Sequence, residues 1–192
     1  MPKSAVQTLR TPQERMVEAL RQVAPIIAAS LFVGLCARIT IPLMPLTPVP
    51  LTMQNFAVLL VGLLLGSRRG FAALVIYLVE GMSGLPVFNP IGPGGLAQLF
   101  GVTGGFLLAY PVVAFVAGYI FERGNKSFVR AAIAGVMAEM ILFLGGVSWL
   151  YVFAHSIKGL YVFVPAEIIK LLVAAGIASR WYRFASREAA KE

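Results

Sequence analysis

Glu167 and Lys170 are the residues of this chain whose types and spacing best suit the binding of a small polar ligand. They lie three positions apart in an otherwise apolar stretch, so an α-helix places both on one face. The carboxylate accepts hydrogen bonds and the ammonium group donates them. Ionisable groups inside an apolar membrane helix are costly and are usually functional. The pair therefore predicts a ligand site, and the alternative is an internal ion pair that only holds the helix in register.

Three further ionisable residues, Arg38, Glu80 and Glu139, fall inside apolar stretches. Glu139 lies deepest, and we expect it to be protonated or to pair with Lys170. We interpret Glu139 as structural. Arg38 and Glu80 lie near the ends of their stretches, where long side chains reach the polar boundary. We interpret both as residues at the rim.

Several kinds of chemistry are excluded by residue type. The chain has one histidine, His155, and no aspartate, so it can form neither a multi-histidine metal site nor a Ser-His-Asp triad. The stretch around Lys126 lacks the glycines of a phosphate-binding loop, and the glycine-rich region 92–105 has no lysine. We therefore expect no cofactor, no metal and no enzymatic activity, including ATP hydrolysis.

These residues are set in a chain that is mostly apolar. Of its 192 residues, 59% are hydrophobic and 12% are charged, where a soluble domain has about 25% charged residues. The composition predicts an all-α integral membrane protein with a single bundle at 23–182. We expect an amphipathic cytoplasmic segment at 1–22, carrying a short helix, and a basic cytoplasmic tail at 183–192. The net charge of +8 lies mostly between apolar segments, which indicates membrane orientation and not nucleic-acid binding.

Hydrophobic stretches predict six transmembrane helices. They run from about 23 to 41, 51 to 66, 71 to 83, 102 to 121, 129 to 149 and 159 to 181. Six crossings place both termini on one side of the membrane. Of the 16 Lys and Arg residues, 13 lie on that same side; the exceptions are Arg38, Lys158 and Lys170. Positive charge concentrates on the cytoplasmic side, so both termini are predicted to be cytoplasmic. The second and third stretches are short, so a merged or re-entrant segment remains an alternative.

Two irregular loops then lie on the outer side. The Pro-rich loop, residues 42–50, contains four prolines and is expected to be extended. The Gly-rich loop, residues 84–105, is so dense in glycine and proline that no helix is expected in it. Irregular backbone at membrane depth is tolerated where it is buried in protein or lines a cavity. We therefore predict that both loops border a cavity that opens outward.

Small residues recur at four-residue spacing in the first predicted span, as Ala24 with Ala28 and Ser30 with Gly34. This spacing lets two helices approach closely. It is compatible with packing inside the bundle and with a docking face for a partner protein.

The run PVPLTMQNFAVLLVGLLLGSRRG at 48–70, the motif GLPVF at 84–88 and the glycines at 104–105 occur together in this chain. Together they resemble the BioY family, the biotin-binding S components of energy-coupling factor (ECF) transporters. The family usually has Gly-Pro-Thr-Gly-Gly where this chain has GVTGG at 101–105. The resemblance is densest over 48–105, and the six-helix layout extends it to the whole chain.

The resemblance implies that biotin binds in an outward-facing pocket formed by the later helices and capped by the loops. The substrate-binding candidates that it carries over are Gln54, Phe88, Asn89, Thr103, Glu167 and Lys170. Biotin has a ureido ring with two N–H donors and a carbonyl acceptor, an apolar thioether ring and chain, and a carboxylate. Glu167 is suited to accept from a ureido N–H. Lys170 is suited to donate to the ureido carbonyl or to keep Glu167 charged.

The resemblance also implies partners: a membrane coupling protein (the T component) and two ATPase subunits, in a bacterial plasma membrane. The docking candidates are Ala24, Ala28, Ser30 and Gly34. Two alternatives stay open. One is an S component for another vitamin, and the other is a lipid-acting membrane enzyme, which would need a general acid and base near the membrane interface.

Overall fold

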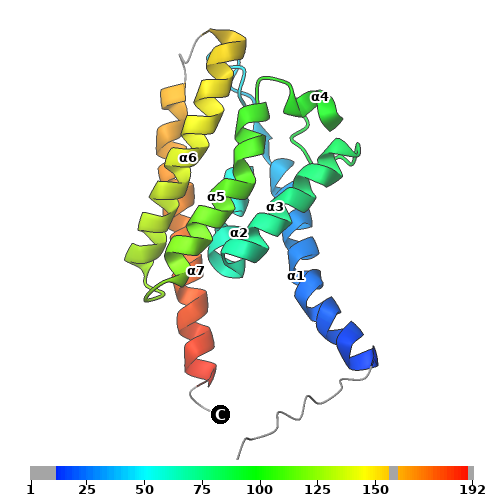
Figure 1. Ribbon diagram of the computed structural model, residues 1–192. Coiled ribbons are helices and arrows are strands. Elements are labelled where there is room, and N and C mark those ends of the chain that lie inside the picture. The colour runs from blue at the N-terminus through cyan, green and yellow to red at the C-terminus, as the bar shows by residue number, and fades with distance from the viewer. Residues whose placement is uncertain (1–11, 156–159, 190–192) are drawn as a thin grey trace, which may run out of the picture.

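The protein is a helical bundle in the computed structural model, which describes residues 12–155 and 160–189 (Figure 1). The α-helices are α1 Pro12–Ala37, α2 Gln54–Leu65, α3 Ser67–Met82, α4 Gly95–Leu99, α5 Gly104–Glu122, α6 Phe128–Ala154 and α7 Phe163–Ala189. A short 3-10 helix, η1 Leu160–Val162, precedes α7. Two short strands, β1 Thr40–Ile41 and β2 Leu51–Thr52, pair antiparallel at the two ends of the Pro-rich loop.

Four helices of the described residues, α1, α5, α6 and α7, are long and apolar enough to cross a membrane. Helix α2 has 12 residues and α3 has 16. At about 1.5 Å per residue, both are shorter than a hydrocarbon core of about 30 Å. The chain is thus a multi-pass helical membrane protein. By length and composition four of its described helices qualify as spans, and the six crossings stay a prediction.

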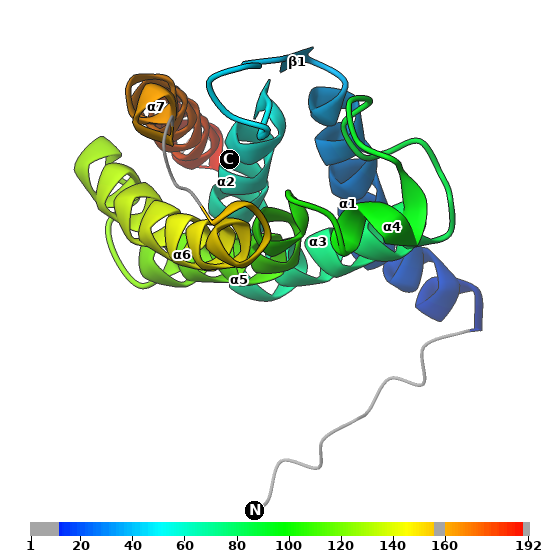
Figure 2. The ribbon, with the colours of Figure 1, turned by 90° about the horizontal axis from the view of Figure 1, so that it is seen from above.

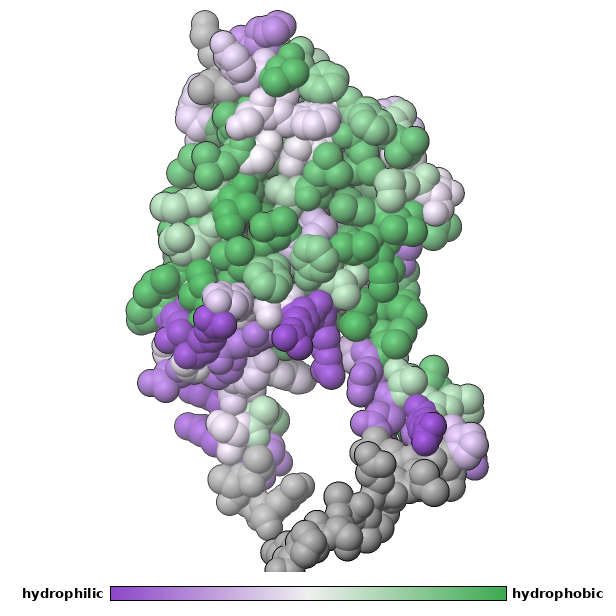
Figure 3. Space-filling view, in the orientation of Figure 1, coloured by the Kyte–Doolittle hydropathy of each residue, from purple (hydrophilic) through white to green (hydrophobic). Residues whose placement is uncertain are grey.

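The two ends of the bundle differ. Helix α1 begins and α7 ends at the lower end in Figure 1, which we call the terminal end. Helix α4 lies at the opposite end, which we call the loop end (Figure 1). The surface in this view is apolar over most of its height, and hydrophilic residues gather toward the terminal end (Figure 3). This distribution fits a bundle embedded in lipid.

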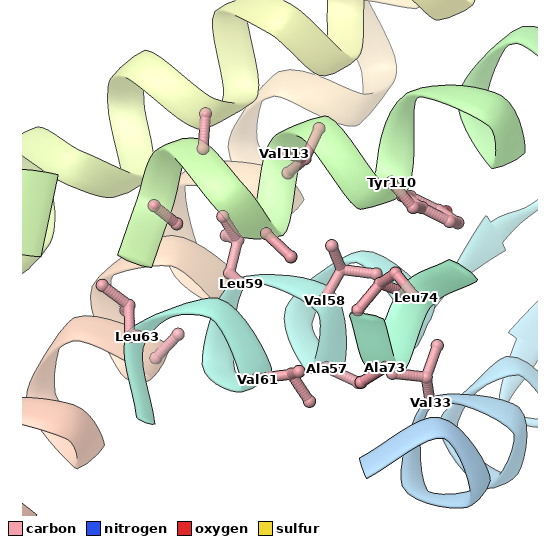
Figure 4. Packing of buried hydrophobic residues seen from close by; sticks show 14 of the residues in the cluster. Val33, Ala57, Val58, Leu59, Val61, Leu63, Ala73, Leu74, Tyr110 and Val113 are labelled. Carbon is pink, nitrogen blue, oxygen red and sulfur yellow. The ribbon is translucent and has the colours of Figure 1, made fainter. Parts of the chain in front are cut away.

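Helix α2 is at the centre of the packing. Seen from above, it lies among α1, α3, α5 and α7 (Figure 2), and it contacts all four. Nine of its residues are buried. Val58 belongs to one apolar cluster with Val33 of α1, Leu74 of α3 and Val113 of α5 (Figure 4). A helix that is apolar on every side is stable only in the interior, so this short helix is surrounded by protein.

Several predicted boundaries need correction. Helix α1 is continuous from Pro12 to Ala37, so residues 12–22 extend the first span and do not form a separate helix. Residues 1–11 lie outside the described part of the chain. Helix α7 continues to Ala189, so most of the predicted tail is helical.

A short helix also lies within the Gly-rich loop, where none was predicted. Helix α4 spans Gly95–Leu99. The reason is local: proline is absent from these five residues, and their one glycine is the first of them. Gly94 and Gly95 have φ of +72° and +56°, a conformation that glycine adopts easily. The glycines and prolines of the loop therefore set the ends of this helix and do not prevent it.

Candidate ligand-binding site

A buried polar network joins α2, α6 and α7. Lys170 Nζ donates to Glu167 Oε1 at 2.8 Å and to the carbonyl oxygen of Thr52 at 2.6 Å. Asn55 Nδ2 donates to Glu167 Oε2 and to Glu139 Oε1, each at 2.6 Å. The exposed fractions of Glu139, Glu167 and Lys170 are 7%, 9% and 7%. Glu167 and Lys170 thus form an ion pair, and each carboxylate oxygen of Glu167 has its own donor; their contact with a ligand stays a prediction.

Local structure explains why these groups meet. The three-residue spacing in α7 places Glu167 and Lys170 on one face. Asn55 is the second residue of α2, and only Met53 separates that helix from β2. Thr52 Oγ1 accepts from the backbone N–H of Gln54 at 3.3 Å, a local bond that stabilises the start of α2. The network therefore lies where α2 begins, next to the Pro-rich loop.

Two buried atoms of the network have no hydrogen-bond partner among the described residues, Asn55 Oδ1 and Glu139 Oε2. Such atoms are rare in proteins and cost stability. We expected Glu139 to pair with Lys170 or to be protonated. The pairing with Lys170 is wrong, because Lys170 contacts Glu167 and the donor to Glu139 is Asn55. That Glu139 is protonated stays a prediction. The network holds two carboxyl groups and one ammonium group, so a proton or a donor from a ligand would complete it.

The network borders a cavity of about 50 Å³. Its polar lining includes Gln54, Asn55, Asn89, Thr103 and Glu167. The remaining lining is mostly apolar and includes Val49, Pro50, Phe106, Leu107, Leu142, Phe143, Leu160 and Phe163. A few convergent polar groups in an apolar wall are typical of sites for small molecules.

The Gly-rich loop contributes Asn89 and Thr103 to this lining. Asn89 is 5% exposed, and its Oδ1 accepts from the backbone N–H of Ile91 at 3.2 Å. Within the described part of the chain, its Nδ2 has no hydrogen bond, so it is a free donor at the cavity. Thr103 precedes α5 and its side chain makes no capping bond. Trp149 Nε1 donates to the carbonyl oxygen of Gly101 at 2.9 Å, which fixes the loop to α6.

Gln54 and Phe88, the other two candidates from the family motifs, contact Tyr77 of α3. Gln54 lines the cavity, but its Nε2 donates to the hydroxyl of Tyr77 at 2.6 Å. Tyr77 in turn donates to the carbonyl oxygen of Val87 at 3.2 Å. Phe88 is outside the cavity lining; it is 3% exposed and packs edge-on against Tyr77, with 5.4 Å between ring centroids. Gln54 and Phe88 thus hold the Gly-rich loop against α3.

The four small residues of α1 do not form one face. Ala24 and Ala28 are exposed, whereas Ser30 and Gly34 are buried. A Cβ at Gly34 would lie 3.0 Å from the Cβ of Val87. Ser30 and Gly34 therefore pack inside the molecule and cannot belong to an exposed docking face, and only Ala24 and Ala28 are free to do so.

Arg38 and Glu80 lie outside the cavity lining. Glu80 Oε1 accepts from Ser30 Oγ at 3.0 Å, which links α3 to α1. Arg38 is exposed and its Nη1 donates to the carbonyl oxygen of Pro86 at 3.4 Å, which links the end of α1 to the Gly-rich loop. Both contacts hold elements together.

Asn55 is the member of the network that sequence reasoning missed. The available signal was an amide in a long apolar run, directly after Gln54. Its role depends on contacts with residues 84 and 112 positions away, which no local pattern contains. Among the described residues, no group of three or more His, Cys, Asp or Glu side chains is placed to hold a metal ion.

Comparison with known proteins agrees with this architecture. The model of the BioY family matches residues 6–187. The chain is 40% identical over 141 residues to the biotin transporter BioY of Thermotoga maritima, an alignment that covers 71% of this chain and 82% of the relative. It is 36% identical over 144 residues to the biotin transporter BioY of Rhizobium etli, covering 67% and 75%.

A solved structure has the same fold. It is a crystal structure of the S-component for biotin from an ECF-type ABC transporter, with a TM-score of 0.77 and 23% sequence identity. The match covers 91% of this chain and 95% of that chain, so the similarity extends over the whole bundle.

Proposed function

We propose that this chain, which belongs to the BioY family, is the substrate-binding S component of an ATP-driven biotin uptake transporter. The observation that carries the proposal is the placement of Glu167 at a mostly apolar cavity, where Lys170, which lies outside the cavity lining, donates to it. Such a site offers a charged acceptor held in position and an apolar surface around it. Both match biotin, a small ligand with a polar ureido ring and an apolar body.

Several parts of biotin have a matching group at the cavity. Glu167 accepts from a ureido N–H, and Lys170, which donates to Glu167 Oε1, holds that carboxylate in position. The free Nδ2 of Asn89 is a donor for an oxygen of the ligand. The thioether ring and the chain lie against apolar side chains such as Phe106 and Phe163. The apolar contacts supply affinity, and the few polar groups fix the orientation of the ligand.

The cavity must widen to admit biotin. Its volume of about 50 Å³ suits a few water molecules, at roughly 10–15 Å³ each, and not a bicyclic vitamin. Val49 and Pro50 of the Pro-rich loop line it, as does Leu160 of η1. The loop carries little regular structure, and such segments open at low cost. We propose that the Pro-rich loop moves to let the ligand in.

The proposal includes an arrangement in the membrane. The chain crosses six times, through α1, α2, α3, α5, α6 and α7, with both termini cytoplasmic and the cavity opening outward in a bacterial plasma membrane. Charge supports it, because the exposed Arg68 and Arg69 at the start of α3 and the exposed Arg123 directly after α5 lie at the terminal end. The central position of α2 supports its crossing as a short helix, since protein and not lipid surrounds it.

The partners of the proposed subunit are a membrane T component and two ATPase subunits. We expect Ala28→Trp to abolish co-purification with the T component, because Ala28 is exposed on α1 and a large ring there prevents close helix contact. Val136→Trp, at a 45% exposed position on α6, is the matched control and should assemble normally. Intact assembly of the Ala28 variant would remove this face of α1 from the interface.

Ligand identity is tested by thermal unfolding of the purified protein with a panel of vitamins. Biotin at 100 times its Kd should stabilise the fold by about 2.7 kcal/mol, because only the folded state binds it. Thiamine and riboflavin should leave the melting temperature unchanged. A shift with another vitamin and none with biotin would identify an S component of different specificity.

A further inference from the structure

Two adjoining grooves at the terminal end of the bundle are separate from the ligand cavity. One groove, of about 460 Å³, is lined by Arg68 and Arg69 of α3 and by Arg123 at the end of α5. The other, of about 360 Å³, is lined by Arg68 and by apolar side chains of α3 and α5, among them Phe71 and Phe115. Arg68 and Phe115 line both grooves, so a polar groove and an apolar groove share one border.

The guanidinium groups of the polar groove have no carboxylate partner among the described residues. Within residues 12–155 and 160–189, the side chains of Arg68 and Arg69 form no hydrogen bond or ion pair. Arg123 lies over the ring of Tyr119, with its Cζ 3.7 Å from the ring centroid. Three exposed positive charges therefore surround one groove without a carboxylate bound to any of them.

The one acidic residue of this groove has other donors. Glu122 Oε1 accepts from the backbone N–H of Ser67 at 2.5 Å, and its Oε2 accepts from Ser67 Oγ at 2.9 Å. The carboxylate is thereby held at the start of α3, where the helix dipole favours negative charge. Three arginines and one glutamate give the lining a net charge of +2. A bound anion would balance this positive charge.

Aromatic rings connect the two grooves. Phe71 and Phe115 meet edge to face at 6.4 Å between centroids, and Phe115 stacks on Tyr119 at 5.6 Å. Tyr119 carries Arg123 on its face. Phe71 and Phe115 are 41% and 36% exposed, on the apolar surface of the bundle that faces lipid. The wall thus changes from apolar to cationic toward the terminal end, where Figure 3 shows hydrophilic residues gathering.

We propose that these grooves bind one anionic phospholipid. Its phosphate accepts hydrogen bonds from Arg68, Arg69 and Arg123, and an acyl chain lies along Phe71 and Phe115. Guanidinium groups bind phosphate oxygens strongly, often through two N–H groups at once. Basic pockets between helices at the membrane surface suit anionic headgroups. The apolar groove faces the hydrocarbon region, so its occupant there is an acyl chain.

The test compares lipids on the intact purified protein in a neutral detergent. Binding of phosphatidylglycerol and of phosphatidylcholine with the same acyl chains is measured by native mass spectrometry. Wild-type protein should bind phosphatidylglycerol at least about tenfold more tightly than phosphatidylcholine. The double substitution Arg68→Gln and Arg69→Gln should remove that preference, since each arginine near an anionic headgroup contributes a severalfold gain in affinity.

A matched control uses two arginines of α7 at the same end. Arg180→Gln with Arg183→Gln makes the same change of net charge in a different groove, lined by α6 and α7, and should keep the preference. Equal losses in both double variants would overturn the proposal, because general surface charge would then explain binding. Equal competition by soluble glycerol phosphate would overturn it as well, because the acyl groove would be unused. Retained lipid preference in the first variant, with loss of T-component binding, would make the groove a protein interface instead.

Discussion

Replacing Glu167 by Gln is expected to weaken biotin binding at least about tenfold while the bundle stays folded. Each carboxylate oxygen of Glu167 accepts from one donor, Lys170 or Asn55. A glutamine has the same size but puts an NH₂ group where one acceptor was, facing a donor. A hydrogen bond to a charged group contributes about 1.5–3 kcal/mol, and about 1.4 kcal/mol corresponds to a factor of ten in affinity.

Lys170→Met should weaken binding at least as much. It leaves Glu167 as a buried charge with no cation and removes a donor from the carbonyl oxygen of Thr52. Breaking a buried pair by removing one member costs about 3–5 kcal/mol in other proteins. Glu167 then loses the donor that holds its Oε1 in position, so the cavity no longer has an oriented acceptor.

Glu139→Gln is the matched control for these variants. Glu139 belongs to the same network, but it is outside the cavity lining. The same change of carboxylate to amide should therefore alter stability more than affinity. Melting temperature and biotin binding should be measured on the same preparations of all three variants. Near-wild-type affinity in folded Glu167 and Lys170 variants would show a structural pair, and would leave Asn89 and Thr103 as the remaining candidates.

The second large effect is expected at the contact between α2 and α5. A Cβ at Gly62 would lie 2.5 Å from the carbonyl oxygen of Ala114 and 2.9 Å from its Cα. Gly62→Ala should therefore force apart two helices whose backbones cannot shift cheaply. Overpacking of this kind costs about 1–3 kcal/mol. At about 2–4 °C per kcal/mol for a chain of this size, the melting temperature should fall by several degrees.

Gly176→Ala is the same substitution at a position without neighbours. Among the described residues, no heavy atom outside its own helix segment lies within 4 Å of a Cβ at Gly176, which lies in α7. Alanine is favoured over glycine in a helix by about 1 kcal/mol, so this variant should melt at the wild-type temperature or slightly above it. A Gly62 variant as stable as the Gly176 variant would contradict the tight packing around α2.

Much of the architecture could be predicted because its signals are local. The spacing of Glu167 and Lys170 predicted that both lie on one face of a helix, and the structure places them there as an ion pair. Composition and motifs predicted a helical membrane protein that resembles the BioY family, and the family match confirms that resemblance. The contact of either residue with a ligand stays a prediction.

What could not be predicted depends on contacts between distant segments. Asn55 lies 84 positions from Glu139 and 112 from Glu167, so nothing near it in the sequence indicates that it bridges two carboxyl groups. The small residues of α1 share one spacing, yet Ser30 is buried and Ala28 is exposed, because α3 and the Gly-rich loop cover only one side of that helix. Spacing identifies a helix face but not what covers it.

The central claim is that this chain binds biotin at the cavity beside Glu167. The most direct measurement is equilibrium binding of labelled biotin to the purified wild-type protein and to its Glu167→Gln variant. We predict saturable binding of one biotin per chain, competed by unlabelled biotin and not by thiamine or riboflavin, with at least about tenfold weaker binding by the variant. Absence of saturable binding by folded wild-type protein, or equal affinities of the two proteins, would contradict it.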